Sequence, residues 1–419
     1  MKYRLLGWGV LGLWLATVLV WLIWPVSSAH LERFPMGGGG WVKRATPADD
    51  PKAHLLLVVT EQQQLSDEQL LKLAAENGAQ SLQLVLGAPD CVAQDQIFQE
   101  AVKRLGATPD LVAGIDRGAA YAWRWLANQN EHESALALSV GFSVKHLDCD
   151  QPLPQAVVKG RWRVAWNDSP DEASAVFVRN QPQAEIAISP YGTPLPVVLF
   201  SQIKRALQGQ ADPVPVVEVP AKAPALDTLT LFYSGDGGWR DLDRDIAERM
   251  AQQGFPVVGI DVLRYFWQHK SLEQAAADLE QLMQHYRERW GIKRFVFAGY
   301  SFGADILPAL YNRLPVTDQQ QTDALLLLAL ARSGGLEVEV QGWLGEVGDD
   351  FKTGPELVKI PERKLFCVYG LEEQAESGCT QAEFKGEVLA LPGGHHFDQN
   401  YEALAERLMA VIRARQNAP

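Results

Sequence analysis

The stretch RFVFAGYSFG, residues 294–303, decides the fold of the second half of this chain. Its first five residues form an apolar run typical of a buried strand, and the pattern Gly-x-Ser-x-Gly follows directly. A serine in this pattern lies on a sharp turn between a strand and a helix, where glycines let backbone segments pass closely. The sequence therefore predicts Ser301 as the nucleophile of a serine hydrolase with an α/β fold.

A serine hydroxyl is a weak nucleophile and needs a histidine base, which a carboxylate then orients. In α/β-hydrolases these groups follow in the chain order serine, acid, histidine. The run LPGGHHF, residues 391–397, offers two histidines, and GLEE, residues 370–373, offers two glutamates. Because the catalytic histidine of related hydrolases commonly follows Gly-Gly directly, the prediction is His395 with His396 as the alternative. For the acid it is Glu373, then Glu372, with Glu376 in reserve.

The same logic predicts groups that hold the oxyanion and the substrate. The backbone N–H of Phe302 can donate to an oxyanion, and a second donor is expected from Asp236 or Gly237 in the glycine-rich run SGDGGW, residues 234–239. Asp305, one helical turn past the serine, and Trp239 are candidates for substrate contacts. A carboxylate at Asp305 would suit a cationic substrate group.

Strands and helices alternate through residues 226–419, which predicts a parallel sheet covered on both faces. Residues 50–210 repeat this layout: LVAGIDRGA, residues 111–119, aligns with VFAGYSFGA, residues 296–304, and Asp116 stands where the serine stands. We therefore expect two α/β-hydrolase-like domains, of which the first is degenerate and non-catalytic. The proline-rich residues 211–225 between them predict an extended linker without regular structure.

The N-terminal residues 1–29 predict a transmembrane anchor or a signal sequence. An uncharged apolar run from Leu5 to Val26 is long enough to span a bilayer, and Lys2 and Arg4 before it predict export of the rest of the chain. The length of the run favours an uncleaved anchor over a cleaved signal. Residues 37–40, all glycine, then predict a flexible tether.

Composition narrows the classes of partner and cofactor. The chain has 419 residues, a net charge of −13 and no basic run, which argues against nucleic-acid binding. Its 4 cysteines form no Cys-x-x-Cys pair, so neither a metal nor a redox site is expected, and the predicted chemistry requires no cofactor. Export favours disulfides over free thiols. Of the three possible pairings, the simplest is Cys91–Cys149 with Cys367–Cys379.

Three motifs together resemble the VirJ/AcvB family of exported bacterial proteins: YSGDGGWRDLD (233–243), GYSFGADILP (299–308) and PGGHHF (392–397). The two-copy layout is similar to the longer AcvB type. The resemblance implies an α/β-hydrolase fold, a periplasmic location in a Gram-negative bacterium, and hydrolysis of aminoacyl-phosphatidylglycerol such as the lysyl or alanyl form. It places the nucleophile at Ser301 and the histidine in the pair His395/His396. VirJ-type members are also linked to virulence and type IV secretion.

The prominent N-terminal anchor departs from the cleavable signal expected of that family, and it would tether the enzyme to the inner membrane near a lipid substrate. The expected partners are thus an aminoacylated phospholipid and the membrane. Two other functions stay open: a lipase or thioesterase acting on other acyl esters, and a non-catalytic secretion accessory protein that binds exported or secretion-system proteins.

Overall fold

The computed structural model describes residues 29–37, 41–87, 90–129, 135–155, 159–168, 170–222, 225–338 and 348–416. These residues form two compact units that divide between residues 211 and 212, except that residues 186–188 group with the second unit. Within this described part of the chain, no helix combines the length and the apolarity needed to cross a bilayer. The anchor or signal predicted for residues 1–29 lies outside the described residues apart from Ala29.

The second unit is built on a seven-stranded sheet in the order β17-β16-β13-β12-β10-β11-β9. Its neighbouring strands pair in parallel except β9 with β11, which pair antiparallel. Its strands are β9 (Val216–Val219), β10 (Thr228–Tyr233), β11 (Val257–Ile260), β12 (Arg294–Tyr300), β13 (Thr322–Leu328), β16 (Leu365–Gly370) and β17 (Glu387–Leu391), and a separate two-stranded ribbon pairs β14 (Ser333–Gly334) with β15 (Phe351–Lys352).

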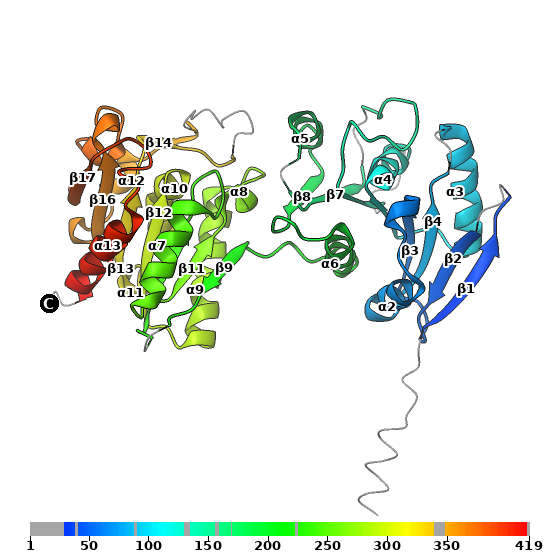
Figure 1. Ribbon diagram of the computed structural model, residues 1–419, viewed down its shortest axis with the longest axis horizontal. Helices are drawn as coiled ribbons and strands as arrows, with labels where there is room; N and C mark the ends of the chain where they lie inside the picture. The colour runs from blue at the N-terminus through cyan, green and yellow to red at the C-terminus, as the bar shows by residue number, and fades with distance from the viewer. Residues whose placement is uncertain are drawn as a thin grey trace, which may run out of the picture. The chain divides into compact units, whose positions relative to one another are not determined.

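Helices cover both faces of this sheet, as continuous apolar strands require. On one face α9 and α10 bury residues such as Leu279 and Leu310, and on the other α7 and α13 bury residues such as Ile246 and Leu408 (Figure 1). The helices are α7 (Asp241–Gln252), α8 (Val262–Tyr265), α9 (Leu272–Trp290), α10 (Phe302–Arg313), α11 (Val316–Gln321), α12 (Gly354–Leu357) and α13 (Tyr401–Gln416), with short 3₁₀ turns η3 (Glu362–Lys364), η4 (Leu371–Glu373) and η5 (Gly378–Thr380).

The first unit has an eight-stranded sheet in the order β1-β2-β4-β3-β5-β6-β7-β8. Its strands are β1 (His30–Pro35), β2 (Trp41–Thr46), β3 (Ala53–Val59), β4 (Ala79–Val85), β5 (Leu111–Ile115), β6 (Leu136–Val140), β7 (Arg161–Trp166) and β8 (Ala184–Ile188). Its helices are η1 (Glu61–Gln63), α2 (Asp67–Asn77), α3 (Cys91–Leu105), α4 (Arg117–Ala127), α5 (Glu172–Arg179) and α6 (Leu195–Gln208).

The two sheets share one topology. The order β2-β4-β3-β5-β6-β7-β8 of the first unit matches β9-β11-β10-β12-β13-β16-β17 of the second, strand for strand. The match includes the antiparallel pair, because β2 pairs antiparallel with β4 as β9 does with β11, although β1 extends the first sheet beyond β2. Both units thus have an α/β-hydrolase-like architecture with a mixed sheet.

Two expectations about the segments before each sheet are wrong. Residues 216–219 of the predicted irregular linker form β9. The first unit begins well before residue 50, because His30–Pro35 and Trp41–Thr46 pair as an antiparallel hairpin. These two strands lie on either side of the glycines that are predicted to form a tether. The cause is the same in both cases. These edge strands are half-exposed or carry charged residues, so they lack the apolar runs that reveal the central strands.

Both disulfides have the simplest predicted pairing, which is confirmed. Cys91 pairs with Cys149 and Cys367 with Cys379, with Cα–Cα distances of 5.2 and 5.6 Å. Two disulfides fit an extracytoplasmic location. Cys91 and Cys149 also lie beside Asp150 in a metal-like group, but sulfurs joined to each other offer no thiolate to a metal.

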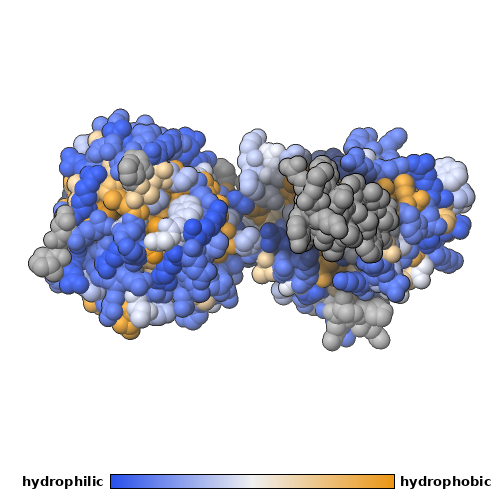
Figure 2. Space-filling model, turned by 90° about the horizontal axis from the view of Figure 1, so that it is seen from below, coloured by the Kyte–Doolittle hydropathy of each residue, from blue (hydrophilic) through white to orange (hydrophobic). Residues whose placement is uncertain are grey.

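The surfaces of the two units are those of ordinary globular proteins. Figure 2 shows one face of each, on which hydrophilic residues predominate and apolar residues form small patches. The strongly apolar strands β10 and β13 are buried along their whole length. Among the described residues, most apolar side chains are therefore buried in the cores around the two sheets.

Candidate active site

Ser301 lies in the sharp turn between β12 and α10. Its φ of 52° and ψ of −120° fall in a region that non-glycine residues rarely adopt. The turn is held by the Ser301 N–H, which donates to the Leu328 carbonyl at 2.9 Å. A Cβ on Gly299 would lie 2.4 Å from the Gly303 carbonyl oxygen, and one on Gly303 would lie 2.3 Å from the Tyr233 carbonyl oxygen. Only glycine fits at either position, so the two glycines set how closely α10 crosses the sheet.

The serine, a histidine and a glutamate form one hydrogen-bonded row. His395 Nε2 lies 2.9 Å from Ser301 Oγ, and His395 Nδ1 lies 3.1 Å from Glu373 Oε2. An ionised carboxylate can only accept, so Nδ1 carries the proton and donates to Glu373, while Nε2 accepts from the serine hydroxyl. This is the arrangement in which a neutral imidazole removes the serine proton and the carboxylate stabilises the resulting cation.

The loops that carry the acid and the histidine contact each other directly. Glu373 ends η4, which follows β16, and His395 follows β17, so both lie at the carboxyl edge of the sheet. The Glu372 N–H donates to the Gly393 carbonyl at 3.0 Å. A Cβ on Gly370 would lie 2.1 Å from the Gly394 carbonyl oxygen, so the loops could not approach this closely with any other residue there. The Cys367–Cys379 disulfide closes the segment that contains the acid.

Replacing Glu373 with Gln is expected to lower kcat for ester hydrolysis by about 10²- to 10⁴-fold, because an amide can stabilise the wrong imidazole tautomer and cannot neutralise the imidazolium. The measurement is steady-state hydrolysis of a nitrophenyl ester. Glu372→Gln is the matched control, since His395 Nδ1 pairs with Glu373 and not with Glu372, and this variant should keep most of the activity. An equal loss in both variants would contradict the assignment of Glu373 as the acid.

The alternative residues have different surroundings. His396 Nδ1 lies 3.0 Å from the hydroxyl of Tyr300, which also donates to the His395 carbonyl at 3.3 Å. Burial raises the pKa of Tyr300. His396 thus contacts the residue before the nucleophile, and Glu372 contributes its backbone to the histidine loop. Glu376 lines the same cavity as the serine, but the carboxylate that pairs with His395 is that of Glu373.

The predicted oxyanion donors lie against the nucleophile. Phe302 is the first residue of α10, and the first N–H groups of a helix have no partner within it. The loop after β10 passes close by, because a Cβ on Gly235 would lie 3.6 Å from Ser301 Cβ. Asp236 and Gly237 in this loop line the cavity beside Ser301. The backbones of two separate segments therefore border the serine, as an oxyanion hole requires.

A cavity of about 520 Å³ opens onto the serine. Its described lining includes Ser301, His395 and Glu373, the glycine-rich loop, and the buried carboxyls of Asp243 and Asp305. Six of these lining residues carry carboxyl groups, whereas Arg240 is the only lysine or arginine among them. The site is therefore acidic, and a cationic ligand fits it better than an anionic one.

The two substrate contacts predicted from the sequence lie in different places. Asp305 lines the cavity, and burial raises its pKa well above the ordinary value. Trp239 is not among the described lining residues: its ring packs edge-on against Phe232, and its ring atoms would lie 2.3 Å from a Cβ on Gly259. The missing side chain of Gly259 makes room for the indole on the sheet, and the role of Trp239 as a substrate contact stays a prediction.

Sequence reasoning missed Asp243. It is the third residue of α7, it is 3% exposed, and burial raises its pKa well above the ordinary value. In the sequence it reads as an ordinary acidic residue in the first turn of a helix, where carboxylates are common. Only its burial under the cavity, which no local pattern reports, distinguishes it.

The corresponding turn of the first unit has the same backbone conformation but no serine at its centre. Asp116 has φ 55° and ψ −120°, and its N–H donates to the Val140 carbonyl at 2.9 Å. A Cβ on Gly114 would lie 1.8 Å from the Gly118 carbonyl oxygen, so the glycines are again required. His146, exposed and 3.8 Å from the Asp116 carboxylate, follows β6, and the loop after β8 contains no histidine.

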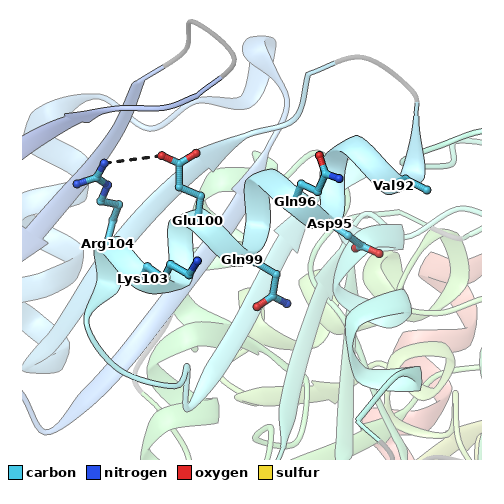
Figure 3. A pocket seen from close by; sticks show the side chains of 7 residues that line it. All are labelled: Val92, Asp95, Gln96, Gln99, Glu100, Lys103 and Arg104. Atoms are coloured by element: carbon cyan, nitrogen blue, oxygen red, sulfur yellow. Dashed lines mark ion pairs between the residues drawn. The ribbon is translucent and has the colours of Figure 1, made fainter.

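The first unit also has a shallow hollow, shown in Figure 3, along the outer face of α3. Its lining comes from this one helix and includes the pair of Arg104 with Glu100 at 3.7 Å. It contains none of the predicted hydrolase residues. The lining residues are Val92, Asp95, Gln96, Gln99, Glu100, Lys103 and Arg104.

Comparisons with known proteins find a family to which the second unit is similar. Residues 227–416 match the family model described as bacterial virulence protein VirJ. No curated protein matches the chain. Similar solved structures include Est1E from Butyrivibrio proteoclasticus (15% identity, 48% of this chain and 93% of that chain, TM-score 0.37). The enol-lactonase from Burkholderia xenovorans LB400 is also similar (12%, 48% and 96%, TM-score 0.37).

The family match spans β10 to α13 and so contains the whole row of Ser301, His395 and Glu373. It agrees with the resemblance carried by the three sequence motifs. Through residues 227–416, the chain is similar to the VirJ family of bacterial virulence proteins.

Proposed function

We propose that the second unit is a serine esterase that hydrolyses the aminoacyl ester of aminoacyl-phosphatidylglycerol, lysyl or alanyl, to phosphatidylglycerol and the free amino acid. The observation that carries the proposal is the row in which His395 joins Ser301 at 2.9 Å and Glu373 at 3.1 Å. The acidic cavity supports a substrate with a cationic acyl group, and the family resemblance supports a lipid ester.

In the first half-reaction Ser301 Oγ attacks the ester carbonyl carbon while His395 Nε2 takes the hydroxyl proton. The N–H groups of Phe302 and of Asp236 or Gly237 hold the oxyanion. The bond to the glycerol oxygen then breaks, and His395 returns the proton to that oxygen, which releases phosphatidylglycerol. In the second half-reaction His395 takes a proton from water, the hydroxide attacks the aminoacyl-serine, and the free amino acid leaves as Ser301 regains its proton.

The proposed location is the periplasm, with the N-terminal segment tethering the enzyme to the inner membrane. The two disulfides support an extracytoplasmic site, and a tether would hold the enzyme at the surface where the lipid lies. The first unit is proposed as non-catalytic, because Asp116 replaces the serine and the loop after β8 lacks a histidine.

The test is an assay of purified protein on vesicles that contain lysyl- or alanyl-phosphatidylglycerol. We expect free amino acid and phosphatidylglycerol to appear in equal amounts, and a deletion strain to accumulate the aminoacylated lipid. If simple acyl esters turn over while both aminoacyl lipids stay intact, the protein is a lipase or thioesterase. If a Ser301→Ala variant restores a deletion strain fully, the protein acts without catalysis, as a secretion accessory protein would.

A further inference from the structure

Asp305 lies one helical turn after the nucleophile, and its side chain borders the catalytic cavity. Its N–H donates to the Ser301 carbonyl at 3.0 Å, which fixes it in the first turn of α10. One helical turn rises about 5.4 Å. A Cβ on Gly334 would lie 3.2 Å from Asp305 Cβ, so the absence of a side chain at Gly334 makes room for this carboxyl.

Only one of the two oxygens of the Asp305 carboxyl group has a hydrogen-bond partner among the described residues. One oxygen, Oδ1, accepts the Ala331 N–H at 2.7 Å. The other oxygen has no partner among the described residues, and no lysine, arginine or histidine of that part of the chain pairs with it. The residue is 7% exposed, so this oxygen is largely removed from bulk water. A buried carboxylate without a cation is costly, and burial accordingly raises the pKa of Asp305. A cation bound beside this carboxyl group would favour its ionised form.

Asp243 is the other buried carboxyl of the cavity, and its surroundings differ. The backbone N–H of Arg240, just before α7, donates to it, and its Oδ1 is unpartnered and sealed from solvent. A ligand that enters the cavity could not reach this oxygen without movement of the protein. Asp305 is therefore the buried carboxyl that offers a free oxygen to a bound molecule.

We infer that Asp305 binds the α-ammonium group of the substrate's acyl moiety and so restricts the enzyme to aminoacyl esters. In such an ester the ammonium nitrogen is separated from the attacked carbonyl carbon by a single carbon atom. A carboxyl group one helical turn beyond Ser301, in the cavity that also contains the serine, is therefore a suitable partner for the α-ammonium when the carbonyl meets the serine. The inference rests on the proposed esterase activity and adds the group that selects the substrate.

The test uses Asp305→Asn, which keeps an oxygen for the Ala331 N–H and the side-chain volume but removes the charge. Two substrates are compared in the same samples: the p-nitrophenyl ester of L-alanine, at a pH where its amino group is protonated, and p-nitrophenyl propionate, which lacks that group. We expect kcat/KM for the alanine ester to fall about 10- to 100-fold, the range for a charge-assisted hydrogen bond, while the propionate ester is unaffected.

The ratio of the two rates within one sample does not depend on how much protein is folded, so a fall in stability cannot imitate the effect. Asp245→Asn is the matched control: Asp245 lies on the surface of α7 and pairs with Arg244 at 3.3 Å, and this variant should keep the wild-type ratio. Equal losses on both esters, or an unchanged ratio in Asp305→Asn, would overturn the inference.

A binding measurement separates this inference from the proposed function. In an NMR titration, L-alaninamide is expected to bind the wild type more tightly than propionamide does, and Asp305→Asn should abolish that difference. If the wild type hydrolyses neither ester, the esterase proposal fails, and the titration alone decides whether Asp305 binds an ammonium group. Equal binding of L-alaninamide by the wild type and Asp305→Asn would overturn the inference.

Discussion

Ser301→Ala is expected to reduce ester hydrolysis by about 10⁴-fold or more, because the hydroxyl is the only atom in the row that can form the acyl-enzyme. The substitution removes one oxygen, and alanine accepts the positive φ of the turn no worse than serine does. Circular dichroism and the melting temperature should therefore stay close to those of the wild type. The rate is measured with a nitrophenyl ester and with the aminoacyl lipid, so that loss on both substrates locates the defect in the chemistry.

The chain supplies its own control for this variant. Asp116→Ala changes the residue at the same place in the equivalent turn of the first unit, where φ is 55° against 52° at Ser301. It should leave hydrolysis unchanged. Substantial activity in Ser301→Ala, or its disappearance in Asp116→Ala, would mean that the nucleophile has been placed in the wrong unit.

His395→Ala is expected to cost about as much activity as Ser301→Ala, because a serine without its base is no better than no serine. The double variant should be no slower than either single variant, since the two residues act as one unit. His396→Ala should lose about tenfold or less, the effect of removing one hydrogen bond to Tyr300. The same nitrophenyl ester assay ranks all three variants. A reversed order of the two histidine variants would move the base to His396.

Most of the site could be predicted because its parts lie in short motifs whose chain order has a topological cause. In a parallel sheet the residues that follow the strands meet at one edge, so a serine after β12, an acid after β16 and a histidine after β17 are brought together by the fold. The choice between His395 and His396 rested on one local rule, that the histidine follows Gly-Gly. In the structure, His395 is the one that contacts Ser301.

The rest depends on contacts that a linear pattern does not contain. Trp239 looks like a pocket residue in the sequence because it follows the oxyanion loop, yet the gap at Gly259 takes its ring onto the sheet. Asp243 looks like a helix cap, yet it is buried. Strands β2 and β9 escape detection because only two residues of β2 and none of β9 are fully buried, and no long apolar run marks either strand.

The turn at Asp116 bears on how motif searches are read. Two stretches of this chain carry glycines that no other residue could replace, and only one of them has a serine and a histidine within reach. The glycines therefore reflect how closely a helix crosses the strands beside it. This steric requirement applies in the first unit as well, where Asp116 stands in place of the serine. A search that scores them would count two active centres in this protein. A search that scores the central residue together with the histidine would find a single candidate active site.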